Sequence, residues 1–326
     1  MRIPVQCNGR RFVWAEDLPP SELCDPAVLD LLQRRGVGLV TSVRPGVRPD
    51  LGCLLRRCRE RDVDVCLWPM LGNADGRWFS AVNADVFAAF CDELLSELDR
   101  DGHRVLGMAF DLEPPIATVR ALLRGELPAW RPPASGAADR PLHRLVARVR
   151  ERGMQAWAAI VPTIVHDAPR RPGWQRLLGT PVDGVGFDCV SPMLYTSIAE
   201  GYSRGVLRRE DALAWLAANA LRCRARFGAA ASVSLGAIGT GAIGNEPTYA
   251  APEQLAEDVD VVLAAGIDHL VVFDLGGMLA RPAPERWLDA MCRPPGHAAA
   301  RPSWRARALD RASTLVSRVG SLWPAR

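Results

Sequence analysis

The sequence predicts an α/β fold, a (β/α)8 TIM barrel followed by a C-terminal helical tail. Apolar runs typical of strands alternate with amphipathic stretches typical of helices, and eight such units can be counted. They occupy about 290 of the 326 residues, which matches the usual size of this barrel. An open doubly wound sheet is the alternative, but no GxGxxG follows the first strand to favour a dinucleotide fold.

Each expected strand is a short apolar run bounded by turn-forming or charged residues. The eight runs are 12–16, 37–43, 63–71, 105–113, 154–163, 185–195, 231–238 and 267–275. The run 105–113 is apolar until it reaches two carboxylates and is then stopped by two prolines. Such runs are typical of parallel strands that helices cover, so a parallel sheet is expected.

Helices are predicted where apolar residues recur with helical spacing between these runs. The helical stretches are 26–35, 51–61, 83–100, 116–124, 141–152, 174–178, 209–227, 252–265 and 284–292. The stretch 83–100 carries the clearest stripe, and Gly36 closes the first helix. Residues 125–140 are rich in Pro, Gly and Ala and are expected to form an insertion.

The chain divides into residues 1–294, the barrel and expected catalytic domain, and residues 295–326, a linker with a basic amphipathic helix. The tail places Leu309, Ala312, Val316, Val319 and Trp323 at helical spacing among arginines. A helix of this kind can lie on a membrane surface. Packing against the barrel, or partial disorder at the chain end, is the more common outcome.

Composition excludes several functions and partners. The net charge of +3 gives no reason to expect a nucleic-acid partner. All forty basic residues are arginine, so Schiff-base and pyridoxal chemistry lack their amine, and no cofactor is expected. The nine cysteines form no CxxC pair, which argues against a zinc site or a disulfide framework. With no signal-like start and no membrane-length apolar run, a cytoplasmic location is expected. Nothing indicates an oligomeric state.

Asp111 and Glu113 are the strongest candidate site residues. Positions i and i+2 of a strand point to the same side, so both carboxylates should project together. Two neighbouring carboxyl groups can separate into a proton donor and a charged helper. Because barrel active sites form at the carboxyl ends of the strands, further candidates at those ends are Trp14, Glu16, Trp68, Trp157, Met193, Tyr195 and Asp274. Indoles combined with acids suit a sugar, although each tryptophan alone is more often core.

The segment 106–113 resembles a degenerate form of the DGxDxDxE strand-four motif of the chitinase-like family 18 glycoside hydrolases. Gly107, Asp111 and Glu113 match the motif, whereas Leu106 and Ala109 stand where the family has aspartates. The resemblance extends over residues 105–275. Met193-Leu-Tyr195 is similar to the family's MxY, with Thr196 in place of the following aspartate, residues 235–239 resemble its glycine-rich seventh strand, and Phe273 stands where its eighth strand has a tryptophan.

The resemblance implies a carbohydrate substrate and a mechanism. Glu113 would be the general acid on the glycosidic oxygen. Asp111 would orient the substrate's acetamido group, which attacks the anomeric carbon, and Tyr195 would hydrogen-bond that group. Ala109 and Phe273 depart from the family pattern, so chitin is not the expected substrate. A plain hydrolase with Glu16 or Asp274 as base or nucleophile stays open.

Three other functions fit parts of the sequence. A phosphate-binding isomerase or lyase could use the glycine-rich residues 236–244. A metal-dependent hydrolase could use an oxygen-rich set, although no HxH or HExxH spacing supports it and no metal is expected. That set is Asp111, Glu113, His166, Asp188 and Asp274. A catalytically inactive barrel that binds a glycan or a partner would explain the missing carboxylates at Leu106 and Ala109.

Overall fold

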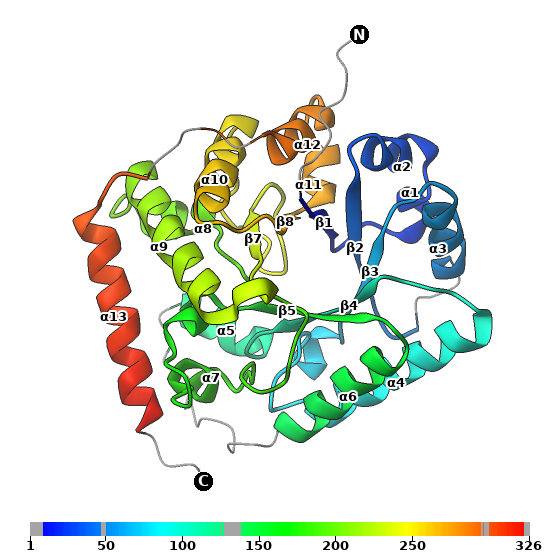
Figure 1. Ribbon diagram of the computed structural model, residues 1–326, viewed down its shortest axis with the longest axis horizontal. Helices are drawn as coiled ribbons and strands as arrows, with labels where there is room; N and C mark the ends of the chain where they lie inside the picture. Colours follow the sequence, from blue (N-terminus) through cyan, green and yellow to red (C-terminus); the bar gives the residue numbers. More distant parts are fainter. Residues whose placement is uncertain are drawn as a thin grey trace.

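Eight parallel strands form a nearly closed barrel with helices around it, which confirms the predicted fold class (Figure 1). The computed structural model describes residues 9–46, 50–124, 126, 138–294, 296 and 300–322. The strands are β1 (Arg11–Ala15), β2 (Val37–Val43), β3 (Val65–Pro69), β4 (Gly107–Leu112), β5 (Gln155–Ile160), β6 (Cys189–Pro192), β7 (Val233–Gly236) and β8 (Leu270–Phe273).

The strands follow one another around the barrel in chain order, and β1 pairs with β8. The seam between β6 and β7 is held by two isolated parallel bridges, Val190 with Ala231 and Met193 with Ser234. At this seam the Leu194 amide donates to the Ser234 carbonyl at 2.9 Å. The barrel therefore closes at its weakest edge beside residues 193–195, which were predicted to belong to the site.

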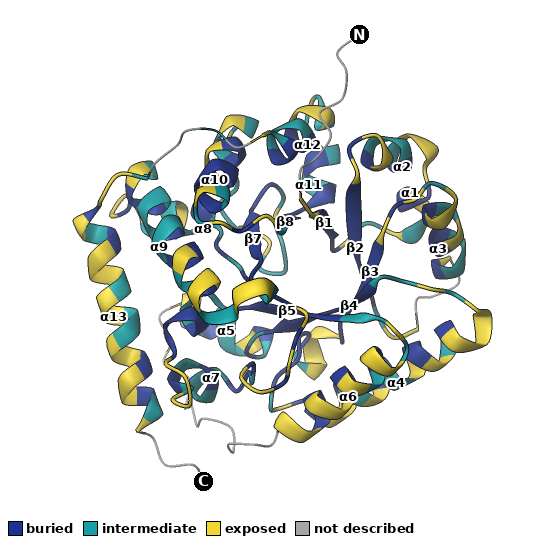
Figure 2. Ribbon diagram, viewed as in Figure 1, coloured by how far each residue is buried: buried dark blue, intermediate teal, exposed yellow. Residues whose placement is uncertain are grey.

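Alternation along the strands separates two apolar clusters. Residues pointing outward, such as Val13, Leu67 and Phe110, pack against the helices. Residues pointing inward, such as Phe12 and Val271, fill the barrel interior, and the strands are buried except at Ser42 and Gln155, which are partly buried (Figure 2). Gly38 is needed inside because a Cβ there would lie 2.2 Å from the Phe12 ring.

The nine predicted helical stretches all form helices. These are α2 (Pro26–Gln33), α3 (Leu51–Glu60), α4 (Ala84–Asp101), α5 (Ile116–Leu123), α6 (Asp139–Glu151), α7 (Gly173–Leu178), α9 (Arg209–Phe227), α10 (Pro252–Ala264) and α12 (Pro284–Cys292). Three short helices were not predicted because they are too short to show a periodic pattern: α1 (Pro20–Leu23), α8 (Thr196–Tyr202) and α11 (Leu275–Leu279). The predicted insertion at 125–140 lies mostly outside the described residues.

The tail forms helix α13 (Trp304–Ser321), which packs across α7 and α9 (Figure 1). The packed face is small and polar, with Ala306, Ser317 and Gly320 buried. Ser317 donates to Asp167 at 2.6 Å, and Trp174 donates its indole N–H to the Ser313 carbonyl at 2.9 Å. Gly173 permits this close approach, because a Cβ there would lie 1.8 Å from the Ser317 carbonyl oxygen.

The apolar stripe of α13 faces solvent rather than the barrel. Leu309, Val316 and Val319 are 41%, 38% and 55% exposed, and Ala312 is also exposed. Trp323, the last residue of the predicted stripe, lies outside the described residues. No described helix combines the length and apolarity needed to cross a bilayer.

The cysteines largely behave as buried apolar residues. Cys66, Cys91 and Cys189 are free and buried, and burial raises the pKa of each thiol. Cys292 is disulfide-bonded, so the expectation of reduced thiols does not hold there.

Candidate active site

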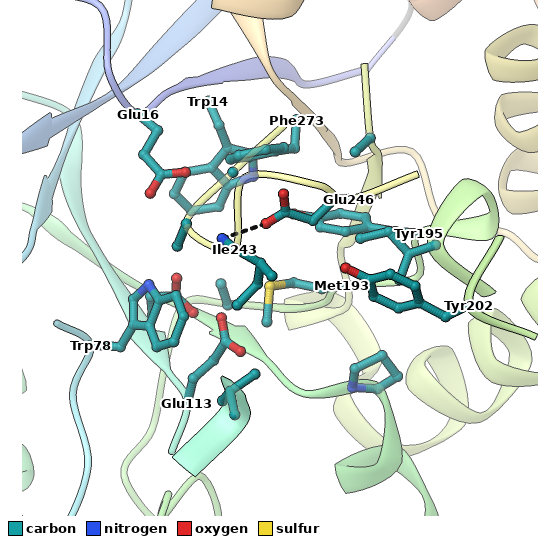
Figure 3. Close-up of a pocket in the computed structure, with 18 of the residues that line it drawn as sticks. Trp14, Glu16, Trp78, Glu113, Met193, Tyr195, Tyr202, Ile243, Glu246 and Phe273 are labelled. Carbon is teal, nitrogen blue, oxygen red and sulfur yellow. Dashed lines mark hydrogen bonds between the residues drawn. The ribbon is translucent and has the colours of Figure 1, made fainter. Parts of the chain in front are cut away.

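A cavity of about 380 Å³ opens at the carboxyl ends of the strands, within the size range of small-molecule sites (Figure 3). Eight of the ten predicted site residues line it: Trp14, Glu16, Trp68, Asp111, Glu113, Met193, Tyr195 and Phe273. Figure 3 shows the Glu16, Glu113 and Glu246 side chains entering the cavity from different sides. The carboxyl ends of β1, β3, β4, β6 and β8 thus converge on one chamber.

Asp111 and Glu113 point into this cavity from the end of β4, as their i, i+2 spacing predicts. Asp111 is buried, and burial together with the neighbouring Glu113 raises the pKa of its carboxyl well above the usual range. Burial also raises the pKa of Glu113, to about 7, while a hydrogen bond from Asp111 lowers it. The pair therefore keeps at least one proton at neutral pH.

Two buried polar atoms of the cavity residues have no partner within the described chain. They are the Asp111 Oδ1, an acceptor, and the Trp68 Nε1, a donor. Below Asp111, Ala109 belongs to the apolar interior and offers no further carboxylate. Because an unpaired buried polar atom is costly, this arrangement suits a ligand that supplies both a hydrogen-bond donor and an acceptor.

Glu16 forms a buried ion pair with Arg77. Its side chain is 3% exposed, and that of Arg77 is 9% exposed. Burial raises the pKa of Glu16, and the Arg77 guanidinium opposes that rise. Arg77 also donates to Asn73 at 3.0 Å. The guanidinium lowers the pKa of both Asp111 and Glu113, so this one cation acts on all three carboxyl groups.

Aromatic rings form much of the remaining wall. Trp14 and Trp68 meet edge to face with centroids 4.7 Å apart. Tyr195 stacks on Phe273 at 5.9 Å, so the smaller ring that replaces the family's tryptophan is part of the cavity wall. Burial and the nearby carboxylates raise the pKa of Tyr195 well above its usual range, which keeps its phenol protonated as a donor.

Two predicted site residues are not among those that line the cavity. Trp157 sits inside the barrel, where its ring packs against Phe12 at 4.7 Å and His269 at 4.8 Å. Asp274 caps α11 by accepting from the Gly277 amide at 3.0 Å, and burial raises its pKa to about 6. Of the two carboxylates considered as base or nucleophile for a plain hydrolase, Glu16 lines the cavity and Asp274 is not among its lining residues.

The metal alternative is not supported by the placement of its residues. Asp188 pairs with Arg150 at 2.7 Å on the barrel's other end, beside the Ala156 amide. His166 bonds Thr314 and Asn219 under α13. Within the described ranges, no three His, Cys, Asp or Glu side chains are grouped as metal ligands.

The glycine-rich segment after β7 does not form an open phosphate cradle. The Glu246 carboxylate accepts from the Ile243 and Gly244 amides, both at 2.8 Å. The Glu246 carboxylate thus occupies two amide donors of this segment and adds negative charge to the cavity. The phosphate-binding alternative loses its structural basis here.

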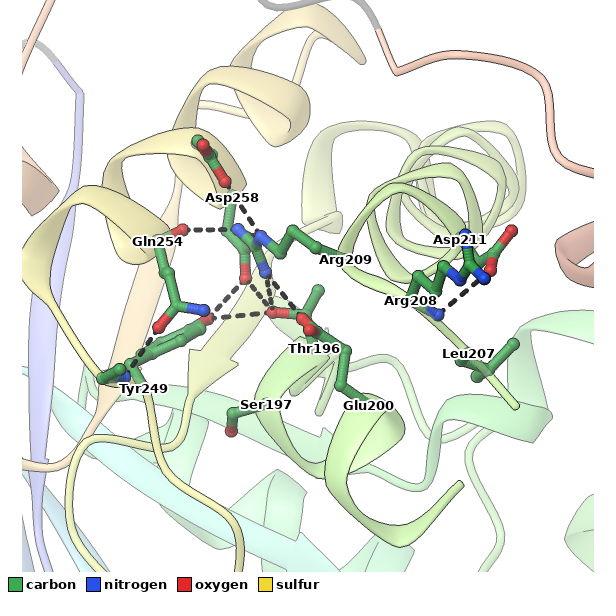
Figure 4. A network of polar contacts seen from close by, with 12 residues as sticks. Thr196, Ser197, Glu200, Leu207, Arg208, Arg209, Asp211, Tyr249, Gln254 and Asp258 are labelled. Carbon is green, nitrogen blue, oxygen red and sulfur yellow. Dashed lines mark hydrogen bonds and ion pairs between the residues drawn. The ribbon is translucent and has the colours of Figure 1, made fainter. Parts of the chain in front are cut away.

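Helix α8 follows Tyr195 directly and is fixed by a buried polar network (Figure 4). Thr196 donates to Asp258 at 2.5 Å, Arg209 donates to the same carboxylate at 2.6 Å, and the Tyr249 hydroxyl also bonds it. Burial raises the pKa of Asp258 to about 6. The network holds α8, and with it one wall of the cavity, against α9 and α10.

Sequence reasoning missed several residues that shape the site, including Trp78, Glu246 and Arg77. Trp78 and Glu246 line the cavity, and both lie in segments that follow predicted strands, so their position was a usable signal. Arg77 lies in the same loop as Trp78, with its guanidinium 5.9 Å from that ring. Nothing in the sequence marks it as the partner of Glu16, sixty-one positions away.

The fold is similar to that of solved glycoside hydrolases. The glycoside hydrolase domain of PgaB (BpsB) from Bordetella bronchiseptica matches with a TM-score of 0.52 and 14% identity, covering 87% of this chain and 99% of that one. A chitinase from Chromobacterium violaceum matches with a TM-score of 0.52 and 10% identity, covering 87% and 98%. At such identities the likeness shows the fold alone. No sequence-family model and no curated protein sequence matches the chain.

Proposed function

We propose that this protein is a glycoside hydrolase in which Glu113 protonates the glycosidic oxygen of a sugar substrate, N-acetylated or not. The observation that carries the proposal is the pair of Asp111 and Glu113 in a cavity walled by aromatic rings. A pKa of about 7 lets Glu113 hold a proton near neutrality and accept one back later. Indole and phenol rings suit the C–H faces of a sugar ring.

For an N-acetylated substrate the resemblance to family 18 supplies the steps. As Glu113 donates its proton, the bond between the anomeric carbon and the leaving oxygen breaks, and the acetamido oxygen bonds that carbon. Asp111 would orient the acetamido group by accepting its N–H at the unpartnered Oδ1. Tyr195 would donate its hydroxyl to the same group. Water then opens the cyclic intermediate while Glu113 takes the proton. For other sugars, Glu16, which also lines the cavity, would act as the base or nucleophile beside Glu113.

Similarity to the PgaB glycoside hydrolase domain and to a chitinase supports this reaction class. The partner proposed is a carbohydrate, with no nucleic acid. A cytoplasmic location stays part of the proposal, supported by the free buried thiols such as Cys66 and weakened by the disulfide at Cys292. The division into a barrel domain at 1–294 and a tail at 295–326 also stays a prediction.

A catalytically inactive barrel that binds a glycan is the second candidate. The observation that favours it is the apolar space beneath Asp111, where Ala109 replaces a carboxylate of the family motif. Such a barrel would bind a sugar through the aromatic wall and the unpartnered polar atoms, but Glu113 and Asp111 would not transfer protons to it.

Hydrolysis of a panel of aryl glycosides by the wild type and by Glu113→Gln tests the function. Removing a positioned acid typically costs about 10²- to 10⁴-fold in rate. Glu285→Gln, the same exchange at an exposed position of α12, is the matched control and should retain full activity. Equal rates for Glu113→Gln and the wild type would refute the role of Glu113. Binding without hydrolysis in every protein would favour the inactive barrel.

A further inference from the structure

The two halves of the cavity differ in chemistry. The inner half is built by strand residues that are almost fully buried, including Trp14, Trp68 and Asp111. The outer half is built by helices α5 and α8 and the loop after β7. Its apolar side chains, here called the outer wall, are Val119, Leu123, Ile198, Tyr202 and Ile243. Asp111 therefore lies at the base of a mouth that is mainly apolar, although Glu246, on the loop after β7, also lines it.

Part of the outer wall is exposed although it is apolar. Leu123 is 48% exposed and Tyr202 is 38% exposed. A ligand that covered these side chains would remove apolar surface from water. A sugar unit would gain less there than an apolar group, because its hydroxyl groups would lose water and only the Tyr202 hydroxyl among the outer-wall side chains could hydrogen-bond in return.

The outer wall is held in place before any ligand arrives. Ser197, on α8, accepts from the Ala237 amide at 2.7 Å and donates to the Pro247 carbonyl at 2.8 Å. Arg120, on α5, donates to the Ala242 carbonyl at 2.7 Å and so ties that helix to the loop after β7. Together with the Thr196 network in Figure 4, these bonds make a preformed surface, which lowers the entropic cost of binding.

Charge restricts the ligand further. Glu16, Glu113 and Glu246 line the cavity, and no arginine or histidine is among its lining residues in the described chain. Of the cations beside the cavity, Arg77 is already paired with Glu16, and Arg120 donates to the Ala242 carbonyl. An anionic ligand would meet carboxylates without a compensating charge, so anionic glycosides are disfavoured.

We propose that the outer wall is an aglycone subsite, and that the substrates are neutral glycosides carrying an alkyl or aryl group. This inference rests on the proposed function for the sugar half of the ligand. The sugar would occupy the inner half, next to Glu113 and the unpartnered atoms of Asp111 and Trp68. The alkyl or aryl group would lie against Leu123, Ile198 and Tyr202.

Binding of a chain-length series tests the subsite without requiring turnover. Methyl, butyl, hexyl and octyl glucosides and the matching N-acetylglucosaminides are titrated calorimetrically, below their micelle concentrations, into Glu113→Gln. Burial of each methylene should tighten binding by about fourfold until the wall is covered. In the same background Leu123→Ser should weaken octyl binding by roughly three- to tenfold and leave methyl binding unchanged.

Leu221→Ser is the matched control. Leu221 is 56% exposed on α9 and does not line the cavity, so octyl binding should be unchanged. Affinity independent of chain length, or equal octyl affinities in Leu123→Ser and Leu221→Ser, would overturn the subsite. The hydrolysis panel separates the two proposals. If glycosides are hydrolysed but their affinities do not depend on chain length, only the proposed aglycone subsite is refuted. Chain-length dependence that Leu123→Ser reduces, in a protein that hydrolyses no glycoside, removes only the catalytic function.

Discussion

Replacing Arg77 by methionine is the sharpest test of the charge arrangement in the site. The substitution leaves the Glu16 carboxylate buried without its cation. Removing one partner of a buried ion pair typically costs about 3–5 kcal/mol. Because the Arg77 guanidinium is what opposes the effect of burial on Glu16, its loss raises the pKa of Glu16 in the folded protein further.

The pH dependence of this loss can be bounded. The folded variant can avoid burying an unpaired charge by keeping Glu16 protonated. This protonation costs about 1.4 kcal/mol for each pH unit above the unfolded pKa of about 4.3. The loss is therefore at most roughly 3.7 kcal/mol at pH 7 and roughly 1 kcal/mol at pH 5. The sign follows from a folded pKa above the unfolded one: stability falls as pH rises from about 4.3 toward the folded value.

The free energy of unfolding is measured by urea titration, followed by tryptophan fluorescence, at pH 5, 6, 7 and 8. The proteins compared are the wild type, Arg77→Met and the double variant Arg77→Met/Glu16→Gln. Arg77→Met should lose stability steeply between pH 5 and pH 7. The double variant should show no such extra slope, because its residue 16 cannot ionise. A loss of equal size at every pH, or a double variant as pH-sensitive as the single one, would refute the reasoning.

Three further predictions concern the proton balance and the tail. Hydrolysis by the wild type should fall as pH rises through about 7, because Glu113 must be protonated to act as acid; a rate–pH profile that stays flat from pH 6 to 9 contradicts this. Glu246→Gln should move the falling limb of that profile to lower pH, since the Glu246 charge raises the pKa of Glu113. The rate–pH profiles of the variant and the wild type are compared, and an unshifted limb contradicts this. Gly173→Val should undock α13, because a Cβ there would lie 1.8 Å from the Ser317 carbonyl oxygen. Amide hydrogen exchange across residues 304–321 should then become faster. Ala312→Val, on the exposed face of α13, is the control and should leave the exchange rates unchanged.

Strand periodicity explains why most of the fold and much of the site could be predicted. A period of two determines which residues face the barrel interior, so Asp111 and Glu113 could be placed together from their spacing alone. The period does not tell how far along the barrel axis a residue lies. Trp157 was therefore expected in the site, whereas it pairs with Ala109 and Cys189 lower in the barrel.

Loop conformation and helix docking could not be predicted in the same way. Arg77 reaches Glu16 from a loop position with a φ of 66°, a conformation that an arginine rarely adopts. Asp274 turns away from the cavity to cap a five-residue helix too short to detect. The apolar stripe of α13 suggested the buried face, yet hydrogen bonds by Ser317 and a close approach at Gly173 decide the docking instead.

Two charges of opposite sign that act on Glu113, Arg77 and Glu246, make its protonation testable by comparing two variants. Burial, the hydrogen bond from Asp111 and the Glu16 charge act on the pKa of Glu113 as well, and beside them Arg77 lowers this pKa and Glu246 raises it. In a Glu16→Gln background, where residue 16 cannot ionise, Arg77→Met should move the falling limb of activity to higher pH, and Glu246→Gln should move it to lower pH. Damage to the site would reduce the rate in both variants but would not move the limb in opposite directions. Opposite shifts would therefore identify Glu113 as the titrating acid, and shifts in the same direction would assign that limb to another group.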